Sequence, residues 1–103
     1  MEFFWWQGCP SWPQALDDLR GALSDAGLDP DAVRIIEITS EADAEGAGFV
    51  GSPTIRVDGH DLFPPNGGEP VGLTCRIYRL RDGRVSPTPD PSDLRDALAR
   101  WAS

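Results

Sequence analysis

The chain has few of the residues that bind metal ions or cross-link a fold. Its 103 residues include two cysteines, Cys9 and Cys75, and one histidine, His60. These three side chains cannot fill a four-ligand zinc site without carboxylates, and no C-x-x-C or H-x-x-x-H spacing occurs. We therefore expect neither a metal site nor a cofactor.

Basic residues and long apolar runs are also scarce. Seventeen acidic against nine basic residues give a net charge of -8, which repels phosphate backbones and anionic membranes. Glu2 stands where a secretion signal needs positive charge, and the apolar run after it is too short to span a bilayer. We expect no nucleic-acid partner, no membrane contact and a cytoplasmic location. There the thiols stay reduced, so both cysteines are expected to be free or redox-active rather than a structural disulfide.

The length predicts one compact domain over residues 1–103, with a hydrophobic content of 40% for a single core. The aromatic run 2–6 predicts a buried strand, and leucines and alanines spaced by three and four residues predict a helix that ends at Gly27. Residues 33–38 are β-branched enough for a second strand. A helix capped by Ser40, with Asp43 three residues later, follows it.

The second half of the chain predicts a hairpin and a last helix. Asp58-Gly59 is a hairpin signal that would join strands at 54–57 and 60–63. Prolines and glycines make 64–74 a loop. Pro91 then begins a helix with one apolar face made of Leu94, Leu98 and Trp101. The resulting order, β-α-β-α-β-β-α, is that of a thioredoxin-like α/β fold, with a central mixed four-stranded sheet flanked by helices.

Residues 75–80 leave two topologies open, because they also alternate like a strand. If 60–63 is the fourth strand, the chain returns through residues 72–75 to the end of the sheet where Cys9 lies. If 75–80 is the fourth strand, Cys75 begins at the far end. The first topology is preferred.

Cys9 follows the first strand and precedes the first helix, where unpaired N–H groups lower the pKa of a thiol. Two helix starts compete. Cys9 as N-cap would place Pro10 at the favoured first position, whereas Ser11 as N-cap would form a capping box with Gln14 and accommodate Pro13. The second start displaces Cys9 into the loop and weakens the effect of the helix on it. The alternative to a reactive thiol is a small buried hydrophobe.

Four motifs carry a resemblance to a known family. They are Gly-Cys-Pro-Ser-Trp at 8–12, Gly-Ser-Pro-Thr-Ile at 51–55, Asp-Gly at 58–59 and Gly-Leu-Thr-Cys-Arg-Ile-Tyr at 72–78. With them the whole chain resembles a small actinobacterial-type thioredoxin-like, or glutaredoxin-like, family, some members of which are labelled alkylmercury lyase. The resemblance implies a cis bond before Pro53, across from Cys9, which leaves the backbone of Ser52 free to pair with a substrate.

Trp12 occupies the position of the second cysteine in the usual C-x-x-C motif of such proteins. The expected catalytic residues are therefore Cys9 as nucleophile and Cys75 as resolving thiol. By strand alternation Trp5 and Trp6 face opposite sides, so at most one of them lines the site. The residues expected to bind the substrate are Trp6, Trp12, Ser52, Pro53 and Thr54.

The leading hypothesis is a protein related to thiol-disulfide oxidoreductases. Its substrate would be a thiol or disulfide, in a protein or in a small molecule. A second hypothesis is an organomercurial or soft-metal binding or lyase-like protein that uses Cys9 and Cys75. A third is a non-catalytic thioredoxin-fold module that presents its aromatic cleft to a partner.

Overall fold

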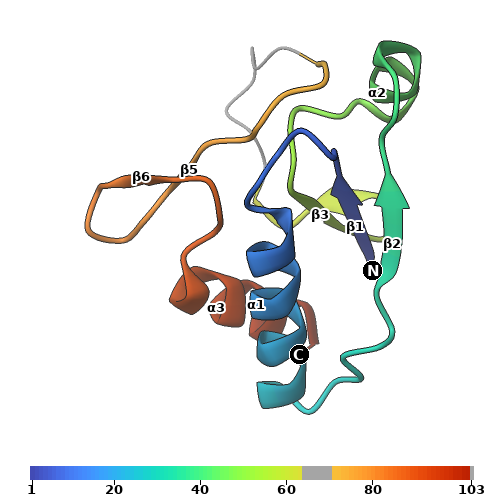
Figure 1. Cartoon of the computed structure of the whole chain (residues 1–103). Helices are drawn as coiled ribbons and strands as arrows, with labels where there is room; N and C mark the ends of the chain where they lie inside the picture. Colours follow the sequence, from blue (N-terminus) through green and yellow to red (C-terminus); the bar gives the residue numbers. More distant parts are fainter. Residues whose placement is uncertain (64–70, 103) are drawn as a thin grey trace.

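A mixed four-stranded sheet and three helices make up the α/β fold of the chain (Figure 1). The structure is a computed structural model that describes residues 1–63 and 71–102. The strands of the sheet are β1 (Glu2–Trp5), β2 (Arg34–Glu37), β3 (Thr54–Val57) and β4 (His60–Asp61). The helices are α1 (Trp12–Asp25), α2 (Glu41–Ala47) and α3 (Pro91–Ala102). A separate hairpin consists of β5 (Tyr78–Arg79) and β6 (Val85–Ser86).

The sheet has the order β2-β1-β3-β4, in which β1 pairs parallel to β2 and antiparallel to β3. The predicted element order is therefore found in the described residues, with the β5–β6 hairpin added before the last helix. The strand at 54–57 has its predicted bounds, and the other three strands are shorter than predicted by one or two residues, because only part of each predicted run pairs in a ladder. Of the predicted loop 64–74, residues 64–70 lie outside the described part.

Neighbouring side chains of β1 divide the core between the two faces of the sheet. Phe3 packs with α1 and α3, through leucines that include Leu19 and Leu98. Phe4 packs on the other face with Phe49 and the α2 side of the fold. Figure 1 shows α1 and α3 side by side on one face of the sheet, and their many mutual contacts agree. Because β1 is packed on both faces, its position in the core is fixed, and so is the start of the loop that carries Cys9.

Helix ends and turns follow the local sequence signals. Gly27 has φ 76° and ends α1, and the N–H of Leu28 donates to the carbonyl of Leu23 at 2.8 Å. The hydroxyl of Ser40 accepts from the N–H of Asp43, as predicted, at 3.1 Å. Asp58 and Gly59 both have positive φ in the β3–β4 hairpin, which confirms the predicted turn.

The last helix is only partly as predicted. It begins at Pro91, and Leu94 and Leu98 are buried in the core. Trp101 does not share that burial and remains 44% exposed. Within the described residues no helix is both long and apolar enough to cross a bilayer.

The structure selects the preferred of the two topologies. His60–Asp61 pairs with β3 as the fourth strand of the sheet. Residues 75–80 do not join the sheet as a strand; Cys75 makes one isolated parallel bridge to Ser52, and Tyr78–Arg79 pairs with β6. Cys75 consequently lies at the end of the sheet where β1 leads into the Cys9 loop.

Candidate dithiol site

Ser11, not Cys9, is the N-cap of α1. Its side chain makes no capping hydrogen bond, so the predicted capping box is wrong; Gln14 instead donates to Asp18 at 2.8 Å, one turn further along. Pro13 is accommodated at the second helical position, as expected for this start. Cys9 therefore lies in the loop before the helix, two residues from its N-cap.

The Cys9 loop turns back tightly onto β1. The N–H of Cys9 donates to the carbonyl of Trp6 at 3.0 Å, and its thiol donates to the carbonyl of Ser52 at 3.4 Å. The residue is 0% exposed. The Ser52–Pro53 peptide bond across from it is cis, as the resemblance implies.

The segment Thr74–Arg76 covers this site by pairing with Ser52 on both sides of the residue. The N–H of Ser52 donates to the carbonyl of Thr74, and the N–H of Arg76 donates to the carbonyl of Ser52, both at 2.9 Å. The backbone of Ser52 is thus occupied by the chain itself. This corrects the expectation that it is free to pair with a substrate.

Gly51 makes this close approach sterically feasible. It has φ 136°, and a Cβ atom there would lie 2.8 Å from the backbone nitrogen of Arg76. Any other residue would be strained at this φ and would push the segment away from Ser52. The glycine in the Gly-Ser-Pro-Thr motif is therefore needed for the segment that carries Cys75.

Both cysteines lie against Ser52: the Cys9 thiol donates to its carbonyl at 3.4 Å, and Cys75 makes an isolated bridge to the same residue. Both cysteines are free, and burial, followed by the hydrogen bond and charge interaction with the neighbouring Cys9, raises the pKa of Cys75 above that of an ordinary cysteine. Cys75 as a whole residue is exposed, whereas Cys9 is buried. The pair thus consists of one enclosed thiol and one that solvent reaches.

This difference in exposure bears on the expected order of attack. Cys9 was expected to be the nucleophile, yet its side chain is fully enclosed. A substrate that approaches this structure from solvent meets Cys75 first. The nucleophilic role expected of Cys9 would therefore fall to a thiol that is enclosed in this structure, whereas Cys75 is exposed.

Three residues expected to bind the substrate are buried instead. Ser52, Pro53 and Thr54 are all enclosed, because the Thr74–Arg76 segment lies over them. Thr54 donates its hydroxyl to the carbonyl of Gly51 at 2.6 Å, which stabilises the turn into β3. Ser52 Oγ is buried and has no hydrogen-bond partner among the described residues.

The tryptophans are divided as strand alternation predicts. Trp5 packs on the α1–α3 side, where its ring centroid lies 4.2 Å from that of Trp12. Trp6 packs on the opposite side, and its ring covers Gly8, where a Cβ atom would lie 2.4 Å from it. Trp6 and Trp12 are half-buried, so both have some surface that a ligand could reach.

Arg76 is a residue of the site to which the sequence analysis assigned no role. Its guanidinium, on a residue only 8% exposed, forms an ion pair with Asp61 at 2.7 Å and donates to the carbonyl of Phe63. It also approaches the hydroxyl of Thr54 at 3.5 Å. These contacts join the residue after Cys75 to β4 and to the start of β3.

Tyr78 adds a second anchor on the same side of the segment. Arg76 lies 4.7 Å from the centroid of its ring, and its hydroxyl donates to the carbonyl of Pro53. Burial is the main cause that raises the pKa of Tyr78, so the hydroxyl keeps the proton that it donates. The Cys-Arg-x-Tyr motif therefore presents Cys75 outward while its arginine and tyrosine hold the segment from within.

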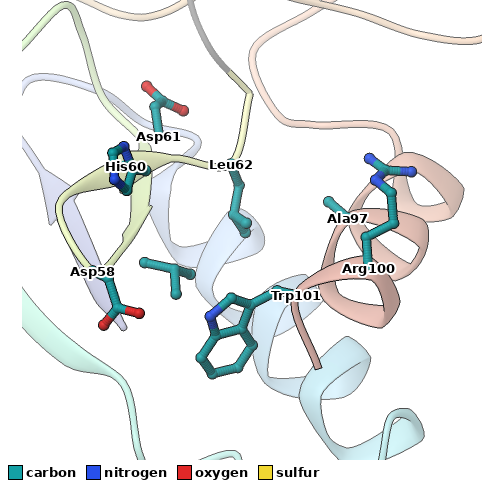
Figure 2. A pocket seen from close by; sticks show the side chains of 8 residues that line it. Asp58, His60, Asp61, Leu62, Ala97, Arg100 and Trp101 are labelled. Carbon is teal, nitrogen blue, oxygen red and sulfur yellow. The ribbon is translucent and has the colours of Figure 1, made fainter. Parts of the chain in front are cut away.

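A separate open hollow lies at the other end of β3. The β3–β4 hairpin and α3 line this hollow, whose volume is about 300 Å³. His60 lies on the hairpin side and Trp101 on the α3 side (Figure 2). His60 is exposed at the turn, as predicted, and is not part of the dithiol site. Among the described residues no group of three or more His, Cys, Asp or Glu side chains could hold a metal ion.

The site thus combines an enclosed thiol, an exposed thiol and a cis-proline turn, held together by Arg76 and Tyr78. No family model, no curated protein and no solved structure matches the chain.

Proposed function

We propose that the chain is a thioredoxin-fold protein that carries out thiol-disulfide exchange through the Cys9–Cys75 dithiol. The fold assignment is supported by the β2-β1-β3-β4 sheet, by α1 after β1 and by the cis bond before Pro53. The observation that carries the function is that both cysteines meet at Ser52, whose carbonyl accepts from the Cys9 thiol and whose backbone bridges to Cys75. A reducing compartment such as the cytoplasm, the proposed location, would keep the resting pair in the dithiol form.

The reaction begins at the exposed thiol. Although its pKa is raised, Cys75 is the thiol that a substrate can reach. It loses its proton to solvent, and its thiolate attacks one sulfur of a substrate disulfide; the other sulfur leaves as a thiolate and takes up a proton. Cys9, deprotonated in turn, attacks the sulfur of Cys75 and releases the second substrate thiol. The substrate disulfide gains two electrons and becomes two thiols, while the protein dithiol loses two electrons and becomes a disulfide.

A redox titration tests this proposal. The full chain is equilibrated in dithiothreitol buffers of graded potential, free thiols are alkylated, and the products are mapped by mass spectrometry. The expected result is one two-electron transition with a Cys9–Cys75 disulfide as product. Failure to form that disulfide under mild oxidation, or disulfide reduction as fast as that of the wild type by a Cys9→Ser or Cys75→Ser variant, would refute the exchange mechanism.

The meeting of both cysteines at Ser52 also favours a second candidate, the binding of a soft metal ion. Two thiolates are the ligand set of linear Hg(II) and Cu(I) complexes, for which soft sulfur donors are preferred. No third His, Asp or Glu ligand joins the cysteines in the described residues, so binding is favoured over a lyase reaction that needs a proton donor. Metal titration of the reduced chain tests this candidate: it requires tight 1:1 binding that either single cysteine variant abolishes.

A further inference from the structure

The Ser52–Arg76 pairing restricts what the site can bind. Peptides commonly bind by adding a strand to an open backbone edge. Beside Cys9 that edge is already used, because the N–H and the carbonyl of Ser52 both bond to the Thr74–Arg76 segment. An extended peptide cannot pair there unless it displaces the segment.

Displacement is opposed by the anchors behind the segment. The buried ion pair between Arg76 and Asp61 and the hydrogen bond from Tyr78 to Pro53 would both have to break. Losing one partner of a buried ion pair is strongly unfavourable, because the other charge remains enclosed. Cys75 is therefore reached from solvent while the segment stays in place.

The charges around Cys75 favour a positively charged substrate over a negatively charged one. A carboxylate oxygen of Glu41 accepts from the N–H of Leu73 at 3.4 Å, two residues before Cys75. The positive charge of Arg76, one residue after it, is neutralised by Asp61 and turned inward. The chain as a whole carries a net charge of -8. An anion that approaches Cys75 is thus repelled locally and by the whole protein.

We infer that the substrate of the Cys9–Cys75 pair is a small disulfide bearing positive charge, taken up at Cys75 without backbone pairing, and not an extended peptide or an anionic disulfide. This inference rests on the proposed function, in which the substrate disulfide is the oxidant of the dithiol. It narrows that function to a substrate class.

Three small disulfides of similar size test the charge preference. The reduced chain is mixed with cystamine (dicationic), 2-hydroxyethyl disulfide (neutral) or dithiodiglycolate (dianionic), and single-turnover rates are measured at low and high salt. Each rate is divided by that of a small free thiol with the same disulfide. We expect cystamine to exceed dithiodiglycolate by about tenfold at low salt and the ratio to fall towards one at high salt. Equal normalised rates at low salt, or a faster anion, would overturn the inference.

Glu41→Gln is the matched variant for the local charge. Glutamine keeps an oxygen that can accept from Leu73 but removes the negative charge. We expect the ratio of cystamine to dithiodiglycolate to fall about twofold, with the neutral disulfide unaffected. An unchanged ratio would show that Glu41 does not select the substrate.

A disulfide-bonded pair of extended peptides tests the backbone argument. Its rate constant should not exceed that of 2-hydroxyethyl disulfide, and the amides of Ser52 and Arg76 should remain protected from hydrogen exchange during turnover. A peptide rate more than tenfold higher, or loss of protection at these amides, would overturn the inference while leaving thiol-disulfide exchange intact. If none of the disulfides oxidises the pair, the proposed function itself has failed.

Discussion

The N–H of Arg76 donates to the carbonyl of Ser52 at 2.9 Å, and this bond places the residue next to Cys75 against the residue that contacts Cys9. Ser52 thus contacts the Cys9 thiol, bridges to Cys75 and bonds to the Thr74–Arg76 segment on both sides. This pairing brings Cys75 to the loop that carries Cys9.

Gly51→Ala should separate the two thiols. The added Cβ would meet the backbone of Arg76 at 2.8 Å, and alanine is strained at φ 136°. We expect the variant to lose about 1–3 kcal/mol of folding stability and to form the Cys9–Cys75 disulfide at least tenfold more slowly. Urea unfolding and alkylation kinetics measure the two effects. Gly27→Ala is the control: φ there is 76°, but the space around it is open, so disulfide formation should be unchanged. Equal disulfide rates in both variants and wild type would contradict the steric role of Gly51.

The single substitution Asp61→Asn should destabilise the chain more than the double substitution that combines it with Arg76→Met. The ion pair is nearly enclosed, so asparagine leaves a buried guanidinium without its counter-charge, at a cost of about 3–5 kcal/mol. Removing both charges eliminates that penalty, although the bonds of Arg76 to Phe63 and Thr54 are lost. A double-mutant cycle from urea unfolding measures the coupling. Additive effects would show that the pair does not stabilise the Cys75 segment.

The alkylation of Cys75 should shift to lower pH when Cys9 is replaced by alanine. In the wild type, burial, the hydrogen bond with Cys9 and the charge on Cys9 raise the pKa of Cys75. Cys9→Ala removes the last two causes, so the midpoint of the iodoacetamide rate against pH should fall while the burial contribution remains. Mass spectrometry after timed quenching follows the reaction at Cys75. A midpoint that stays where it is in the wild type would mean that the thiols do not interact.

The raised pKa of Cys75 also predicts how the stability of the fold changes with pH. Because the pKa of Cys75 is raised in the folded chain, the folded state holds this proton more tightly than the unfolded state. Its contribution is therefore complete below the unfolded thiol pKa of about 8.5 and is lost as the pH rises through the folded value. Wild type should lose stability in this alkaline range relative to a Cys75→Ser variant, as unfolding at stepped pH would measure.

Much of the frame follows from local sequence signals. Gly27, Ser40 and the Asp58-Gly59 turn define element ends through backbone conformation and capping, which depend on nearby residues only. The opposite packing of Trp5 and Trp6 follows from strand alternation in the same way. Such features can be predicted because neighbours along the chain decide them.

The environment of the thiols could not be predicted in this way. Arg76 and Tyr78 alternate with exposed Cys75 and Ile77, a pattern that resembles a strand with one polar face. In the structure, Arg76 points inward to form the ion pair with Asp61, and Tyr78 points inward to donate to the carbonyl of Pro53. Neither residue pairs with a strand of the four-stranded sheet. The enclosure of Cys9 depends on this long-range pairing, so no local signal shows which thiol solvent reaches.

Oxidation of the pair should stabilise the fold. A Cys9–Cys75 bond would close a loop of roughly 65 residues, and in the chain-entropy account such a constraint on the unfolded chain contributes about 4 kcal/mol. Both cysteines already lie against Ser52, so little rearrangement of the native state should be needed to form the bond. Urea unfolding of the oxidised chain, with the reduced chain and a Cys75→Ser variant as controls, measures the gain, and only the oxidised wild type should show it. An oxidised chain no more stable than the reduced one would mean that the native segment is strained by the bond. The anchors at Arg76 and Tyr78 would then hold Cys75 in place for the dithiol and not for the disulfide.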